Sequence, residues 1–72
     1  MGRTQGTLIG SRLRAARERA GVSQAELARR LHASRPTIVA LESNRNRATL
    51  DWLHKAALAL GCSPHELDDR LK

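Results

Sequence analysis

The sequence predicts an all-α fold, a compact bundle of five short helices, and three observations support this prediction. Apolar residues recur at helical intervals along most of the chain. Helix-start signals precede these segments, each a Ser or Thr that can cap, in two cases followed by Glu three residues later. The 72 residues include one Trp and neither Phe nor Tyr, so Leu, Ala, Ile and Val must fill the interior. Helices accommodate that set of side chains well.

The N-terminal part divides into a short arm and the beginning of a single domain. Residues 1–6 are polar and lack periodicity, which predicts a flexible arm, and residues 7–72 form the domain. A first helix is expected from Thr7, its cap, to Ala20, and Gly21 ends it. Its buried side is predicted to consist of Ile9, Leu13, Ala16 and Ala20.

Two short helices are predicted in the middle of the chain. Ser23 and Glu26 have the spacing of a capping box, so a helix begins there and ends near His32. Ser34 is the N-cap candidate of the next helix, which is expected over residues 35–43. The few residues left between them match the length of a helix-turn-helix connection.

The second of these helices has two different sides. One side is expected to pack and contains Ser34, Thr37, Ile38 and Leu41. The other is displayed and contains Arg35, Pro36, Val39, Ala40 and Ser43. The displayed side has a basic residue at its N-terminal end and small side chains beyond it, which suits a DNA major groove about 12 Å wide.

Two more helices are predicted in the C-terminal third. Thr49 caps the first and Gly61 closes it, with a buried side formed by Leu50, Leu53, Ala56, Ala57 and Leu60. Ser63 and Glu66 have the spacing of a second capping box, which predicts a fifth helix over residues 64–71 with Leu67 toward the core.

Charge is distributed unevenly along the chain. The net charge is +6, and residues 1–47 hold ten Arg against three Glu, whereas residues 48–72 have a net charge of −1. The basic part contains the two central helices, so the asymmetry indicates a polyanionic partner on that side. A core this small also gives a marginally stable monomer, which dimerisation would stabilise.

Signs of catalysis, metal binding and membrane insertion are missing from the sequence. Cys62 is the single cysteine, and it does not approach metal-ligand spacing with any of the three histidines, His32, His54 and His65. There is no nucleophile elbow and no Gly-rich phosphate loop. We therefore expect no enzyme activity, no metal and no cofactor. The sequence has no signal peptide or membrane span, so it predicts a cytoplasmic protein without membrane contact.

A known family has a similar pattern. The chain resembles the phage-repressor-like (Cro/cI-type, XRE family) helix-turn-helix domain over roughly residues 8–67, with the matching positions Gln24, Ala28, Ile38, Leu41, Glu42, Leu50, Leu53, Ala57, Leu60, Gly61 and the SPHEL segment. The resemblance implies a five-helix bundle of the lambda-repressor-like DNA-binding type. His32 occupies a position where the family usually has Gly, so His32 is expected to adopt a left-handed backbone conformation.

The chemistry of the second central helix and the resemblance together imply two groups of DNA contacts. Base contacts are expected from the displayed side, where the Arg35 guanidinium suits guanine and small apolar groups suit a thymine methyl; the candidates are Arg35, Pro36, Val39 and Ala40. Backbone contacts are expected from the start of the first central helix, from the second helix and from the loop after it; the candidates are Gln24, Ser34, Thr37, Ser43, Asn44, Arg45, Asn46 and Arg47.

A structural ion pair is also expected. Arg17 lies at the edge of the buried side of the first helix, where an unpaired charge is costly. Glu42 is the best partner because the resemblance implies pairing of the corresponding Arg and Glu. The alternative is an exposed, unpaired Arg17.

The leading functional hypothesis is a sequence-specific regulator of transcription that binds double-stranded DNA at a palindromic operator as a homodimer. Leu58 and Leu71 are the candidate apolar contact between two copies. Repression by occupying DNA is the simplest mechanism, and a surface contact with RNA polymerase is a further option. The main alternative is an antitoxin-like module that holds a toxin partner and also binds DNA. A third reading, a binder of RNA or of nucleic acid without sequence preference, is weakened by the lack of aromatic residues for stacking.

Overall fold

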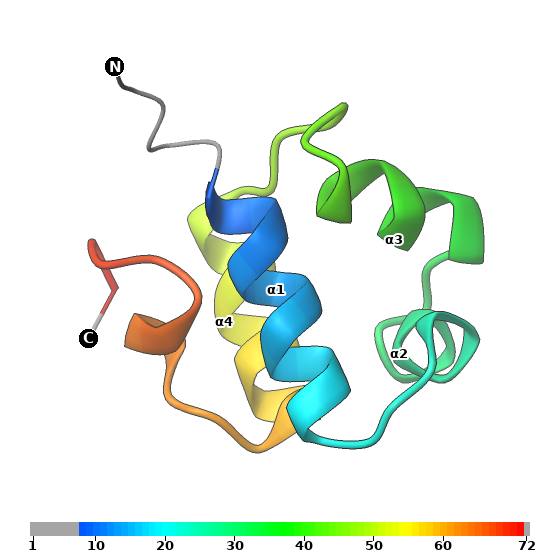
Figure 1. Cartoon of the computed structure of the whole chain (residues 1–72), viewed down its shortest axis with the longest axis horizontal. Helices are drawn as coiled ribbons and strands as arrows, with labels where there is room; N and C mark the ends of the chain where they lie inside the picture. Colours follow the sequence, from blue (N-terminus) through cyan, green and yellow to red (C-terminus); the bar gives the residue numbers. More distant parts are fainter. Residues whose placement is uncertain (1–7, 72) are drawn as a thin grey trace.

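Four α-helices and one 3-10 turn make up the structure, a computed structural model that describes residues 8–71. The elements are α1 (Leu8–Arg19), α2 (Gln24–Arg30), α3 (Arg35–Glu42), α4 (Leu50–Leu60) and the 3-10 turn η2 (Pro64–Glu66). Figure 1 shows α2 and α3 together at one end of the molecule and the C-terminal segment at the other. Helix α3 packs against both α1 and α2, and α2 also packs against α4. The expected arm and the expected cap Thr7 lie outside the described residues.

The core draws one fully buried side chain from each part of the fold. These side chains are Leu13, Leu27, Ile38, Leu53 and Leu67, from α1, α2, α3, α4 and the segment after η2 respectively. Smaller residues complete the cluster around them, including Ala16, Ala28, Ala56 and Ala57. The helical periodicity of the sequence therefore identified the core, with two exceptions. Ala20 was expected to be buried but is exposed, because α1 ends at Arg19 and the chain turns away. Leu50 was expected on the buried side of α4 but is 43% exposed, because it is the first residue of that helix and lies at its open end.

Each α-helix ends in the same way, at a residue with a left-handed backbone. The φ angles are 71° at Gly21, 55° at His32, 63° at Asn44 and 70° at Gly61. At each end, the next residue's N–H bonds back across the last turn, in the Val22–Arg17, Ala33–Ala28, Arg45–Ala40 and Cys62–Ala57 pairs. This is the Schellman arrangement, which satisfies carbonyls that a helix end would leave unpaired. The left-handed conformation expected for His32 is thus confirmed.

The fifth helix predicted over residues 64–71 is replaced by a single 3-10 turn, so the described chain has four α-helices rather than five. After η2 the Asp68 carboxylate accepts a hydrogen bond from the backbone N–H of Arg70, at 2.9 Å. An Asp side chain that binds the backbone two residues on competes with helical hydrogen bonding. The chain therefore folds back against α1 instead of continuing as a helix.

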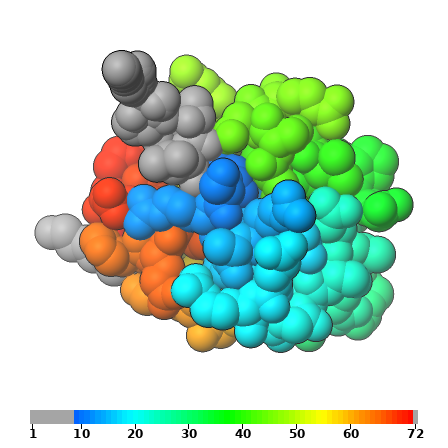
Figure 2. All heavy atoms as spheres, in the orientation of Figure 1, coloured from blue at the N-terminus to red at the C-terminus, as the bar shows by residue number. Residues whose placement is uncertain are grey.

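The C-terminal segment is attached to α1 by Arg12, and Figure 2 shows that segment in orange beside the blue of α1. Arg12 donates to the Asp69 carboxylate at 2.7 Å and to the carbonyl oxygen of Glu66 at 3.1 Å. This arrangement brings Leu71 into the core cluster, where it is only 4% exposed. The sequence had placed Leu71 in an apolar contact between two copies, and this prediction was wrong because the chain folds back. Among residues 8–71, every helix is too short or too polar to cross a bilayer.

Candidate nucleic-acid interface

The connection between α2 and α3 is short and is fixed at both ends by hydrogen bonds. Ser23 caps α2 by accepting the N–H of Glu26 at 3.0 Å. The Glu26 carboxylate binds Arg29 and Arg30 instead of completing the expected capping box. On the other side of the turn, Ser34 accepts the N–H of Thr37 at 3.3 Å and so caps α3. The two helices therefore meet at a defined angle, as a helix-turn-helix requires.

Helix α3 has the two sides that the sequence predicted, with one correction. Ile38 and Leu41 are buried, while Arg35 and Pro36 are exposed. Val39 and Ala40 are half-buried. They lie on the same side of α3 as the exposed residues of its first turn. Ser34 was assigned to the packed side but is exposed, because as N-cap it lies outside the helix, where its hydroxyl is 2.9 Å from that of half-buried Thr37.

The loop after α3 holds its polar side chains in a defined arrangement. Ser43 Oγ donates to the Val39 carbonyl at 2.9 Å and accepts from Arg45 Nε at 3.1 Å. This holds the Arg45 guanidinium against the end of α3. Asn44 to Arg47 are all exposed, so a continuous run of amide and guanidinium groups follows directly on the displayed side of α3.

Asn44 also has a structural role that the sequence did not indicate. Its Oδ1 accepts the backbone N–H of Gly10 at 3.1 Å and thus pairs one of the N–H groups that the start of α1 leaves free. Gly10 itself lies against the end of α3. A Cβ atom there would be 2.5 Å from the carbonyl oxygen of Glu42 and 2.8 Å from Asn44 Oδ1. The one available signal was a glycine inside a helical pattern, which often marks a close backbone approach.

Replacing Gly10 with alanine is expected to lower the free energy of unfolding by about 1–3 kcal/mol, because the added methyl must displace backbone atoms of α3. The matched control is Ser11→Ala, at an exposed position one residue on in the same helix. Chemical denaturation of both variants measures the effect. Equal stabilities for the two variants would show that α1 and α3 can move apart without cost.

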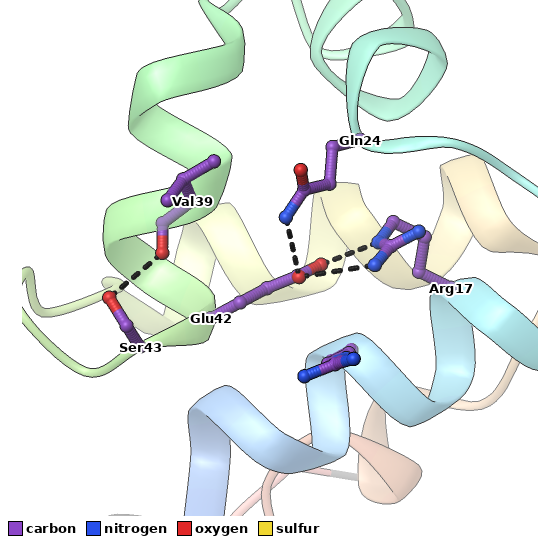
Figure 3. A pocket seen from close by; sticks show the side chains of 6 residues that line it. Arg17, Gln24, Val39, Glu42 and Ser43 are labelled. Carbon is purple, nitrogen blue, oxygen red and sulfur yellow. Dashed lines mark hydrogen bonds and ion pairs between the residues drawn. The ribbon is translucent and has the colours of Figure 1, made fainter.

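A buried ion pair links α1 to α3, where the sequence expected one. Arg17 Nε donates to Glu42 Oε2 at 2.6 Å and Nη2 donates to Oε1 at 3.2 Å, with side chains only 11% and 5% exposed (Figure 3). The hydrogen bonds that Arg17 donates to Glu42 raise the pKa of Arg17, while burial acts in the opposite direction. Arg17 also donates to the Val22 carbonyl at 2.8 Å. The guanidinium is thus well satisfied despite its burial.

Gln24 belongs to the same network. Its Nε2 donates to Glu42 Oε1 at 3.1 Å, so α2 is connected to the ion pair between α1 and α3 (Figure 3). The sequence assigned Gln24 to the DNA backbone and gave no sign of this bond. An amide nitrogen carries two hydrogens, so Gln24 keeps one N–H for another acceptor.

Pairing of charges separates the arginines into two groups. Each of the seven acidic side chains is paired with a basic one, in the pairs Arg12–Asp69, Arg14–Glu18, Arg17–Glu42, Arg19–Glu66, Arg29–Glu26, Arg30–Glu26, Lys55–Asp51 and Arg70–Asp68. Within residues 8–71, the arginines that lack a carboxylate partner are Arg35, Arg45 and Arg47. All three are exposed and lie on α3 or in the loop that follows it. The described arginines that lack a carboxylate partner therefore lie together on one surface.

Comparisons with known proteins agree with this geometry. A family model described as a helix-turn-helix domain matches residues 8–69. The restriction-modification controller protein C.AhdI from Aeromonas hydrophila is 33% identical over 85% of this chain and 88% of its own, with a TM-score of 0.79. The clp gene regulator ClgR from C. glutamicum is 27% identical over 92% of this chain and 86% of its own, with a TM-score of 0.84.

A third similar structure includes nucleic acid. SinR, a master regulator for biofilm formation whose DNA-binding domain is known from Bacillus subtilis, has been solved in complex with DNA. In that complex it is 28% identical over 82% of this chain and 95% of its own, with a TM-score of 0.74. No curated protein sequence matches the chain.

Proposed function

The chain belongs to the Cro/cI-type helix-turn-helix family, and we propose that it regulates transcription by binding a partly palindromic operator as a homodimer. The observation that carries this proposal is the distribution of charge. Among the described residues, Arg35, Arg45 and Arg47 have no carboxylate partner, whereas the other arginines and Lys55 do. Exposed guanidinium groups on one surface are what a phosphate backbone and the edges of bases require.

The proposed DNA-binding surface has one part that contacts the bases and another that contacts the phosphate backbone. In this proposal α3 enters the major groove, with Arg35 at its first turn directed at a guanine and Pro36, Val39 and Ala40 against base edges. The exposed segment Ser43–Arg47 follows the sugar-phosphate backbone, together with Ser34, Thr37 and the remaining N–H of Gln24. Asn44 contributes through its amide nitrogen, since its Oδ1 already accepts from Gly10.

A homodimer supplies two copies of this surface, and α4 provides the candidate contact. Leu58 is 83% exposed and Leu50 is 43% exposed, and they are the large hydrophobic side chains most exposed among residues 9–71. They lie eight residues apart on one face of α4, so two antiparallel α4 helices would bring Leu50 of one copy near Leu58 of the other. Recognition of two half-sites about 34 Å apart requires such a pair.

Replacing Leu58 with glutamate is expected to weaken operator binding about tenfold or more without unfolding the domain, because two introduced carboxylates would face an apolar contact across the dimer axis. Sedimentation should show a shift from dimer to monomer, while circular dichroism stays unchanged. Lys55→Gln, at an exposed position of the same helix, lowers the net charge by the same one unit and so controls for the change of charge. A monomer that binds its operator as tightly as the wild type would refute the dimer.

Selection from randomised DNA tests the proposal as a whole. The expected result is enrichment of a partly palindromic site, with half-site centres separated by about one helical turn or a multiple of it. Binding without sequence preference would contradict it.

The regulators similar to this chain support control of transcription by occupation of DNA. A second macromolecular partner is the alternative, and the SinR protein has been solved in complex with the SinI protein. In this chain, residues 9–71 would offer such a partner, whether a toxin or RNA polymerase, only two exposed large hydrophobic side chains. We therefore favour direct action on DNA.

A further inference from the structure

A surface hollow lies where α1, α2 and α3 meet. It is lined by Arg14, Arg17, Gln24, Val39, Glu42 and Ser43 (Figure 3). Val39 and Ser43 also belong to the displayed side of α3, so the hollow borders the proposed reading surface directly. It lies on the side of α3 that faces α1 and α2.

The hollow presents hydrogen-bond donors although a carboxylate lines it. Glu42 is held by two bonds from Arg17 and one from Gln24, and its side chain is only 5% exposed. The groups that remain toward solvent are donors: the second N–H of Gln24 and the guanidinium of Arg14, whose side chain is 64% exposed.

Arg14 is held only weakly where it is. Its ion pair with Glu18 is a single contact of 3.1 Å between two largely exposed side chains one helical turn apart. Water and salt screen such pairs, and the long Arg side chain gains freedom on release. Exchange of Glu18 for another anion as the partner of Arg14 therefore costs little free energy.

We propose that this hollow binds a phosphate of the DNA backbone, with Arg14 supplying the charge and Gln24 a neutral donor. The inference rests on the proposed binding of α3 in the major groove. A helix in a groove about 12 Å wide has a phosphate chain along each edge. The Ser43–Arg47 loop accounts for contacts at one end of α3, and the hollow accounts for a contact along its flank. The added residue is Arg14 of α1, which lies outside the helix-turn-helix.

Salt titrations of DNA binding test the proposal with full-length protein. Arg14→Ala is expected to weaken binding about five- to tenfold on operator and random DNA alike, and to reduce the slope of log affinity against log salt by about 0.9. Arg29→Ala is the matched control, an exposed arginine paired with a glutamate on α2, and it should change neither quantity. Circular dichroism verifies folding, and Arg14→Gln serves as a second variant.

Two further measurements identify the partner of Arg14. Glu18→Gln releases Arg14 and should strengthen DNA binding about two- to threefold in the wild type but less in the Arg14→Ala background. Methylphosphonate substitution, one phosphate at a time, should reveal a position that weakens the wild type and leaves Arg14→Ala unaffected. If each methylphosphonate substitution lowers the DNA affinity of Arg14→Ala as much as that of the wild type, the proposal is wrong.

The outcomes separate this inference from the proposed function. A wild type that shows no sequence preference refutes the proposed function itself. A wild type that reads its operator, with an Arg14→Ala variant that has the same affinity and salt slope, refutes only the phosphate site. A free phosphate ion offers the same chemistry, so binding of inorganic phosphate that depends on Arg14, without an effect on DNA, would also overturn the proposal.

Discussion

Replacing Glu42 with alanine is expected to lower the free energy of unfolding by about 3 kcal/mol, because it leaves the buried Arg17 guanidinium without its carboxylate. The two side chains are 11% and 5% exposed, so water replaces little of the lost interaction. In a domain of this size the loss corresponds to a fall in Tm of roughly 12–24 °C. Thermal melts followed by circular dichroism measure it.

Two variants locate the origin of the loss. Glu18→Ala removes an exposed carboxylate from an ion pair on α1 and should cost less than about 1 kcal/mol. The double variant Arg17→Leu with Glu42→Leu should recover part of the stability, since an apolar pair leaves no buried charge unpaired. A Tm for Glu42→Ala that equals that of Glu18→Ala would mean that the pair contributes nothing to the fold.

The helix boundaries could be predicted because their signals are local. Ser23, Ser34 and Thr49 each cap the helix that follows by accepting an N–H three residues on. The left-handed residues that end the helices include two glycines, which adopt that conformation at no steric cost. Neighbouring residues decide both features, so no knowledge of the tertiary fold was needed.

The fifth helix could not be predicted from such signals. Its start is as well marked as the others, and the Glu66 carboxylate does accept the N–H of Ser63 at 3.2 Å. What ends it after one turn is Asp68, whose carboxylate binds both the backbone and the guanidinium of Arg70. Whether an aspartate continues a helix or closes a turn depends on the packing of Leu67 and Leu71, which is a tertiary property.

The candidate site was predictable in composition but not in its internal connections. The residues of α3 and its loop follow from helical periodicity. The Gly10–Asn44 bond joins residues 34 positions apart, and the Gln24–Glu42 bond joins residues 18 apart. The local sequence pattern does not predict contacts between residues so far apart in the chain. They show that groups assigned to DNA from the sequence also hold the three helices together, so their variants need stability controls.

Replacing Arg35 with alanine is expected to cost about 1–3 kcal/mol of operator binding and to relax base preference at one position in each half-site. The physical reason is the planar guanidinium, which can donate two hydrogen bonds to O6 and N7 of one guanine. Arg35 is exposed at the first turn of α3 and has no carboxylate partner among residues 8–71, so nothing in the free protein competes for it.

Replacing Arg47 with alanine should act differently, because a loop arginine on a phosphate meets the same group in every sequence. Affinity should fall evenly for all DNA, and the salt slope should decrease by roughly one unit. Arg45→Ala should behave likewise, with some loss of loop order because Arg45 binds Ser43. Titrations of each variant against a randomised operator, at several salt concentrations, measure both effects. If Arg35→Ala lost affinity evenly while Arg47→Ala changed the preferred base, the loop would read the sequence and the first turn of α3 would hold the backbone, the reverse of the proposed arrangement.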